Sequence, residues 1–123
     1  MADELILIVD DNELNLKLAR DVLRFAGFRT VEAATGNDGV AAALEEQPDL
    51  VLMDIQLPDM PGTEAARKIR AGEHAAAIPI VALTSFAMKG DRERFLDEGF
   101  DGYLEKPISV REFPDQVRGF LPG

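Results

Sequence analysis

The stretch Leu50-Val51-Leu52-Met53-Asp54 decides the fold of this chain. Four apolar residues in succession, without alternation, predict a short strand buried on both faces, as the strands of a parallel sheet are. Pro58, Pro61 and Gly62 follow closely and prevent the strand from continuing. Asp54 therefore lies at the carboxyl end of the strand, the edge at which open α/β sheets bind ligands. An aspartate that ends a strand is common, so its function depends on what else reaches this edge.

Segments of strand length alternate with segments of helical periodicity along the whole chain. Apolar runs predict strands over residues 5–9, 30–33, 50–53, 78–83 and 102–104. The first intervening helix is predicted from the spacing of Leu14, Leu18, Val22 and Phe25 on one face. The strict alternation of strand and helix favours an α/β fold, a doubly wound parallel sheet of (βα)5 type with helices on both faces.

The last helix has its own start signal. Ser109 and Glu112 have the spacing of a capping box, in which the serine side chain accepts a hydrogen bond from the glutamate amide. Pro114 conflicts with a helix interior because it has no amide hydrogen to donate, so the helix is expected to tighten or to begin late. Phe113, Val117 and Phe120 are expected to face the core.

Length and composition exclude several classes of protein. The chain has 123 residues, which suits one domain over residues 1–123, and it contains no cysteine, which excludes disulfides and thiolate metal sites. A formal net charge of −10 repels phosphate backbones and anionic lipids, so we expect neither nucleic acid nor membrane as a direct partner. No apolar run approaches the roughly 20 residues of a membrane span, and the N-terminus is acidic, so a cytoplasmic protein is expected.

Carboxylates follow two of the predicted strands. Asp10 and Asp11 close the first strand as Asp54 closes the third, and adjacent parallel strands bring such ends side by side. Three carboxylates at one place repel one another unless one is protonated or a cation lies among them. Because the ligands are oxygen atoms only, the expected cation is Mg²⁺, with Mn²⁺ able to replace it in vitro. An Asp-Asp pair alone is weak evidence, since loops are rich in acidic residues.

Two further strand ends extend this set. Thr84 follows the fourth predicted strand and supplies a hydroxyl, and Lys106 follows the fifth and supplies an ammonium. A carboxylate nucleophile, a divalent cation, a hydroxyl donor and an ammonium are suited to holding the oxygens of a phosphoryl group. Each residue alone is explained as a strand-end cap or a solvated charge, but their occurrence together favours phosphoryl chemistry.

The chain resembles the receiver domain of two-component response regulators, the CheY-like family, over essentially its whole length. The resemblance rests on residues 8–12 (Ile-Val-Asp-Asp-Asn), 52–58 (Leu-Met-Asp-Ile-Gln-Leu-Pro), 83–84 (Leu-Thr) and 106–107 (Lys-Pro), whose order and spacing are specific. Residues 12–15, 86–91 and 106–110 look most like the single-domain DivK-like regulators. The resemblance implies a strand order of 2-1-3-4-5.

The resemblance also implies a role for each matched position. Asp54 would be the phosphoacceptor, taking a phosphoryl group from a phosphohistidine of a sensor histidine kinase or phosphotransferase. Asp11, Asp54 and the backbone carbonyl of Gln56 would hold Mg²⁺, with Asp10 acting through a bound water. Lys106 and Thr84 would contact phosphoryl oxygens.

Two further features follow from the resemblance. Thr84 and Tyr103 would form the switch, in which Tyr103 turns inward as Thr84 moves towards the phosphoryl group and a downstream protein then binds. A cis peptide bond would join Lys106 to Pro107. Ser85 stands where alanine is common, and Phe86 occupies a position that influences access of water to the phosphoryl group.

Other readings lead to different expectations. A phosphatase of the haloacid-dehalogenase type also uses a strand-end aspartate, but it requires a second aspartate where this chain has Gln56. Nucleotide-binding glycine loops are missing from the sequence. We therefore expect a signalling protein and not an enzyme, either monomeric or dimerising on phosphorylation. The alternative is a receiver module excised from a hybrid histidine kinase or another multidomain regulator.

Overall fold

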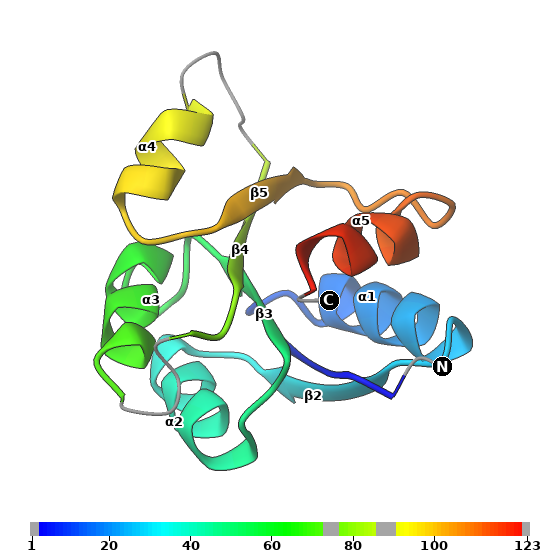
Figure 1. The fold of residues 1–123 in the computed structure, drawn as a ribbon, viewed down its shortest axis with the longest axis horizontal. Helices are drawn as coiled ribbons and strands as arrows, with labels where there is room; N and C mark the ends of the chain where they lie inside the picture. The colour runs from blue at the N-terminus through cyan, green and yellow to red at the C-terminus, as the bar shows by residue number, and fades with distance from the viewer. Residues whose placement is uncertain (1–2, 73–76, 86–90, 122–123) are drawn as a thin grey trace.

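The computed structural model describes residues 3–72, 77–85 and 91–121, in which strands and helices alternate (Figure 1). The strands are β1 (Leu5–Val9), β2 (Arg29–Ala33), β3 (Leu50–Asp54), β4 (Ile80–Thr84) and β5 (Gly102–Glu105). The helices are α1 (Glu13–Phe25), α2 (Gly36–Glu46), α3 (Gly62–Arg70), α4 (Asp91–Asp97) and α5 (Phe113–Phe120). Residues 86–90, which include Phe86 and part of the DivK-like match, lie outside the described residues.

The strands form one five-stranded sheet in which all neighbours are parallel and the order is β2-β1-β3-β4-β5. Helices α1 and α5 cover one face, while α2, α3 and α4 cover the other (Figure 1). Side chains of β3 alternate between the two resulting cores: Val51 and Met53 pack on the second group of helices, Leu50 and Leu52 on the first. The predicted doubly wound α/β fold and its strand order are confirmed.

The strand β4 begins two residues later than the sequence predicts. Pro79 precedes it and has no amide hydrogen for the sheet, although its carbonyl accepts a hydrogen bond from the Val51 amide at 2.9 Å. Ile78 is buried without belonging to the strand. The prediction included residues 78 and 79 because Ile78 is apolar, but these residues belong to the segment that precedes the strand.

The apolar residues that predicted α1 are mostly not the residues that the helix buries. Leu14 and Phe25 are 77% and 96% exposed, and Leu18 is also exposed. The core contacts come from a second set of small and aliphatic residues, namely Leu16, Ala19 and Leu23. Because α1 has an apolar stripe on each of two faces, its periodicity identified a helix but did not identify which face it buries.

The last helix begins late, as its proline requires. Ser109 Oγ accepts a hydrogen bond from the Glu112 amide at 3.3 Å, but helical geometry is assigned only from Phe113. Pro114 thus lies in the first turn of α5. Backbone amides in a first turn have no acceptor within the helix, so a proline there breaks no hydrogen bond. Phe113 and Val117 are buried, and Phe120 is half-buried at the edge of the same core.

Candidate functional site

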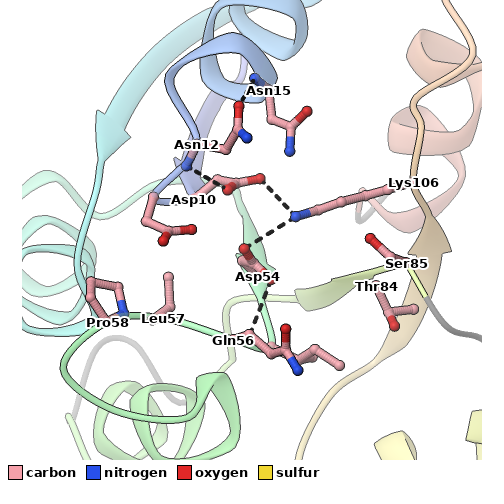
Figure 2. A pocket seen from close by; sticks show the side chains of 12 residues that line it. Asp10, Asn12, Asn15, Asp54, Gln56, Leu57, Pro58, Thr84, Ser85 and Lys106 are labelled. Atoms are coloured by element: carbon pink, nitrogen blue, oxygen red, sulfur yellow. Dashed lines mark hydrogen bonds and ion pairs between the residues drawn. The ribbon is translucent and has the colours of Figure 1, made fainter.

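The carboxyl ends of β1 and β3 bring the predicted aspartates together (Figure 2). Val9 pairs with Met53 in the parallel register, so the residues that follow them lie side by side. Asp10 and Asp54 are buried, and Asp11 is exposed. One carboxylate oxygen from each of the three lies within 4.8 Å of the others. They line a cleft of about 440 Å³ that also contains the side chains of Thr84 and Lys106.

Lys106 extends from the end of β5 between the two buried aspartates (Figure 2). Its Nζ lies 3.0 Å from Asp10 Oδ2 and 3.1 Å from Asp54 Oδ2. The Lys106 amide donates a hydrogen bond to the Thr84 carbonyl at 2.8 Å, and the peptide bond to Pro107 is cis, the isomer that the family resemblance implies. The sequence placed Lys106 at this edge but did not predict its pairing with Asp10.

The charges of the cleft shift the pKa values of its residues. Burial raises the pKa of Asp54, and repulsion by Asp10 adds to the rise, whereas the hydrogen bond from the Gln56 amide and the ammonium of Lys106 oppose it. Burial alone would lower the pKa of Lys106, but the two carboxylates outweigh it and raise that pKa overall. The cleft therefore holds more negative charge than a single ammonium satisfies.

The buried aspartates fit a hard divalent cation. Asp10 Oδ1 accepts a hydrogen bond from the Asn12 amide at 3.0 Å, and Asp54 Oδ1 accepts one from the Gln56 amide at 3.1 Å. Among the described residues, no backbone amide or hydroxyl donates to the buried Asp10 Oδ2, which pairs with the Lys106 ammonium at 3.0 Å. Three carboxylates whose oxygen atoms lie within 4.8 Å of one another, with a single ammonium beside them, form a ligand set that suits Mg²⁺.

The structure places the two residues that are predicted to form the switch in different environments. Thr84 ends β4, is buried and lines the cleft together with Ser85. Tyr103 is half-buried on β5 away from the cleft, with its ring centroid 5.7 Å from that of Phe95 in α4. The strand β5 thus connects Tyr103 to the cleft through Lys106, three residues further along the chain.

Some residues of the cleft were given no role in binding the cation or the phosphoryl group from the sequence. Asn12 and Asn15 line it at the start of α1, where Asn12 Oδ1 accepts a hydrogen bond from the Asn15 amide at 3.0 Å. The N-cap preference of asparagine was the available signal. Leu57 and Pro58 line the opposite side from the loop after β3 (Figure 2).

The fold and the cleft are those of a receiver domain. Residues 6–118 match the family model described as "Response regulator receiver domain", so the chain belongs to this family and functions in phosphorylation-based signalling. Among curated relatives, it is 43% identical to the polar-differentiation response regulator DivK of Brucella ovis and 42% identical to that of Brucella anthropi, in each case over 94% of both chains. The similarity to single-domain DivK-like regulators is thereby confirmed.

Solved structures show the same relationship. The receiver domain of the sensor histidine kinase PA1611 from Pseudomonas aeruginosa, described with a magnesium ion coordinated in its active-site cleft, is 38% identical with a TM-score of 0.87, covering 97% of this chain and 98% of that one. The chemotaxis protein CheY4 of Vibrio cholerae is 25% identical with a TM-score of 0.91, covering 98% of this chain and all of the other (100%).

Proposed function

We propose that this receiver accepts a phosphoryl group from a phosphohistidine onto Asp54 and signals by phosphorylation-dependent binding to a downstream protein. The observation that carries the proposal is the placement of Asp54. Its carboxylate is buried at the end of β3, yet it lines an open cleft beside two further aspartates and one ammonium. A nucleophile held in a polar cleft with a site for a divalent cation suits phosphoryl transfer.

In the proposed step, a carboxylate oxygen of Asp54 attacks the phosphorus atom and forms an acyl phosphate. The bond from phosphorus to the imidazole nitrogen breaks, and the nitrogen keeps the electron pair. Asp11, Asp54 and the backbone carbonyl of Gln56 would hold Mg²⁺, or Mn²⁺ in vitro, with Asp10 contacting it through a water. When bound, the cation supplies positive charge that offsets the charge on the phosphoryl oxygens.

Lys106 and Thr84 would then bind the transferred group. Lys106 Nζ already lies 3.1 Å from Asp54 Oδ2, so a phosphoryl oxygen attached to Asp54 would come within reach of the ammonium. The Thr84 hydroxyl is proposed to contact a second phosphoryl oxygen. The movement of Thr84 would let Tyr103 turn inward and would change the surface formed by α4 and β5.

The partners belong to the same proposal. Membership of the family implies a sensor histidine kinase or phosphotransferase as donor and a protein as target. We propose that the donor docks on the exposed apolar side of α1. Leu14 on this side is only two residues from Asn12, which lines the cleft, so a donor bound there would lie next to Asp54. The formal net charge of −10 supports a protein partner and not nucleic acid.

Several properties complete the proposed function. The described residues include no helix of the length and apolarity needed to cross a membrane. We propose that the protein acts in the cytoplasm, as a monomer or as a dimer that forms on phosphorylation, and that it is not itself an enzyme.

A second candidate is a receiver module within a hybrid histidine kinase. It is favoured by the 38% identity to a receiver domain that belongs to a sensor histidine kinase. Sequencing the ends of the native gene separates the two candidates. A contiguous kinase region in the reading frame would establish the module, and flanking stop and start signals would establish the single-domain protein.

The mass of the intact protein after incubation with a small phosphodonor tests the proposal. We expect one phosphoryl adduct on the wild type in the presence of Mg²⁺, and no adduct without Mg²⁺ or in Asp54→Asn. An adduct of equal yield in Asp54→Asn, or the absence of an adduct on the wild type under all conditions, would contradict the proposal.

A further inference from the structure

In the loop that leads from Asp54 to α3, residues 55–61, the two ends are hydrogen-bonded to each other. Gln56 and Pro61 form an isolated antiparallel bridge, and the Gly62 amide donates a hydrogen bond to the Ile55 carbonyl at 2.9 Å. The Gln56 amide also donates to Asp54 Oδ1 at 3.1 Å. The position of this loop therefore determines both the orientation of the Asp54 carboxylate and the position of the Gln56 backbone.

Asp59, at the far end of this loop, binds the start of a different helix. Its Oδ1 accepts a hydrogen bond from the Gly36 amide at 2.7 Å, and its Oδ2 accepts one from the Asn37 amide at 2.9 Å. Both donors belong to the first turn of α2, where amides have no intrahelical partner. The hydrogen bond from Asn37, and then that from Gly36, lower the pKa of Asp59, so the ionised carboxylate makes this contact.

The side chain of the neighbouring residue Met60 also packs against the start of α2. Met60 is buried, although the residues on either side of it are exposed. A Cβ atom built on Gly36 would lie 2.5 Å from Met60 Cγ and 3.2 Å from Asp59 Oδ1, so a larger residue at position 36 would have to displace the Met60 side chain. The loop is thus attached to α2 by two charge-assisted hydrogen bonds and by one buried side chain.

We propose that Asp59 is a positioning residue for the cation and phosphoryl site. It holds the 55–61 loop on α2 and thereby fixes the Gln56 carbonyl and the Gln56 amide that orients Asp54. Asp59 contacts neither the cation nor the phosphoryl group and acts through the backbone. The inference rests on the proposed function, because that function makes the Gln56 carbonyl a ligand of Mg²⁺.

The chain offers a matched control at the same end of α2. Thr35 Oγ1 accepts a hydrogen bond from the Asp38 amide at 3.1 Å, so Thr35 caps the same first turn without contacting the loop. Thr35→Ala removes a cap from α2 and leaves the attachment of the loop intact. Asp59→Ala removes a cap and the attachment together.

Two measurements separate positioning from capping. The first is the hydrogen exchange of the Gln56 and Gly62 amides in protein without divalent cations, which we expect to accelerate in Asp59→Ala but not in Thr35→Ala. The second is the Mg²⁺ affinity by calorimetry, which we expect to fall about tenfold in Asp59→Ala, as for other groups that orient metal ligands, and to stay unchanged in Thr35→Ala.

Two further variants test the same contact more gently. Asp59→Asn keeps one oxygen acceptor and loses the charge, so we expect it to restore part of the Mg²⁺ affinity lost in Asp59→Ala. Gly36→Ala displaces Met60 and Asp59 from the side of α2, and we expect it to weaken Mg²⁺ binding without a change in the loop sequence. These two variants keep the test decisive if Asp59→Ala does not fold.

Equal Mg²⁺ affinities in the wild type, Asp59→Asn and Gly36→Ala, with unchanged amide exchange in the loop, would overturn the inference while leaving the proposed function standing. A wild type that binds no Mg²⁺ and takes no phosphoryl group would overturn the proposed function and this inference with it.

Discussion

Asp54 is held where its own charge is disfavoured. Burial and repulsion by Asp10 raise its pKa in the folded protein. The Asp54 carboxyl group therefore keeps its proton to a higher pH in the folded protein than in the unfolded chain. This difference adds to the free energy of unfolding fully below the unfolded-state pKa of about 4. That stability is lost as the pH rises through the higher folded-state pKa.

The raised pKa of Asp54 predicts how stability changes when its negative charge is removed. Without divalent cations, Asp54→Asn is expected to raise the melting temperature by a few degrees near neutral pH, and the gain should shrink as the pH falls towards about 4. Thermal unfolding over this pH range measures it. Asp97→Asn, which removes one exposed carboxylate of α4, is the control for the loss of a negative charge as such. A variant of Asp54 that is less stable than the wild type at neutral pH would contradict the account.

The sequence predicted the residues at the strand ends more completely than the contacts among them. Asp10, Asp54, Thr84 and Lys106 were predictable because parallel strands align their carboxyl ends. The attachment of Asp59 to Gly36 was not, since it depends on how a loop packs against a helix 23 residues away in the chain. Local patterns carry no information about such a contact.

At the scale of elements, β5 and α4 form the surface that is proposed to change on phosphorylation. Tyr103 is the only tyrosine and the sequence contains no tryptophan, so intrinsic fluorescence reports on this position alone. Its ring packs on Phe95 at an interplanar angle of 52°, and Phe95 packs edge-on against Phe100. A rotation of Tyr103 must change this aromatic contact.

Phosphorylation is therefore expected to change the tyrosine fluorescence of the wild type. In Thr84→Ala, the phosphoryl adduct should still form but the change in fluorescence should be lost, because the hydroxyl that links the two events is missing. Thr63→Ala, which removes a hydroxyl from α3 outside the cleft, is the control and should behave as the wild type. An equal change in Thr84→Ala would show that Tyr103 responds without Thr84.

The helices show where periodicity is sufficient and where it is not. The spacing of apolar residues predicted the five helices, and the missing amide hydrogen of Pro114 predicted the late start of α5. Periodicity did not identify the buried face of α1, since apolar residues lie on two sides and only tertiary packing selects Leu16, Ala19 and Leu23. The unburied stripe with Leu14 and Leu18 is then available for a partner.

At the scale of the whole molecule, this exposed stripe separates two kinds of donor. A small phosphodonor needs only the cleft, whereas a protein donor also needs a docking surface. Replacing Leu14 and Leu18 by serine is expected to lower the rate of phosphotransfer from the cognate donor at least about tenfold, the effect of losing an apolar interface contact. Phosphorylation by the small donor should not change.

Leu44→Ser is the control, because Leu44 is exposed on α2, which covers the other face of the sheet. Equal rates of phosphotransfer from the protein donor in all three proteins would rule out docking through the α1 stripe.

The measurement that tests the central claim most directly is the position of the phosphoryl group in the chain. Treating the phosphorylated protein with borohydride reduces an aspartyl phosphate to homoserine, and peptide mass spectrometry then locates the changed residue. We predict homoserine at position 54 alone, formed only when Mg²⁺ was present during phosphorylation. Homoserine at position 10 or 11 with Asp54 unmodified would contradict the account, because it would assign the nucleophile to another carboxylate of the cleft.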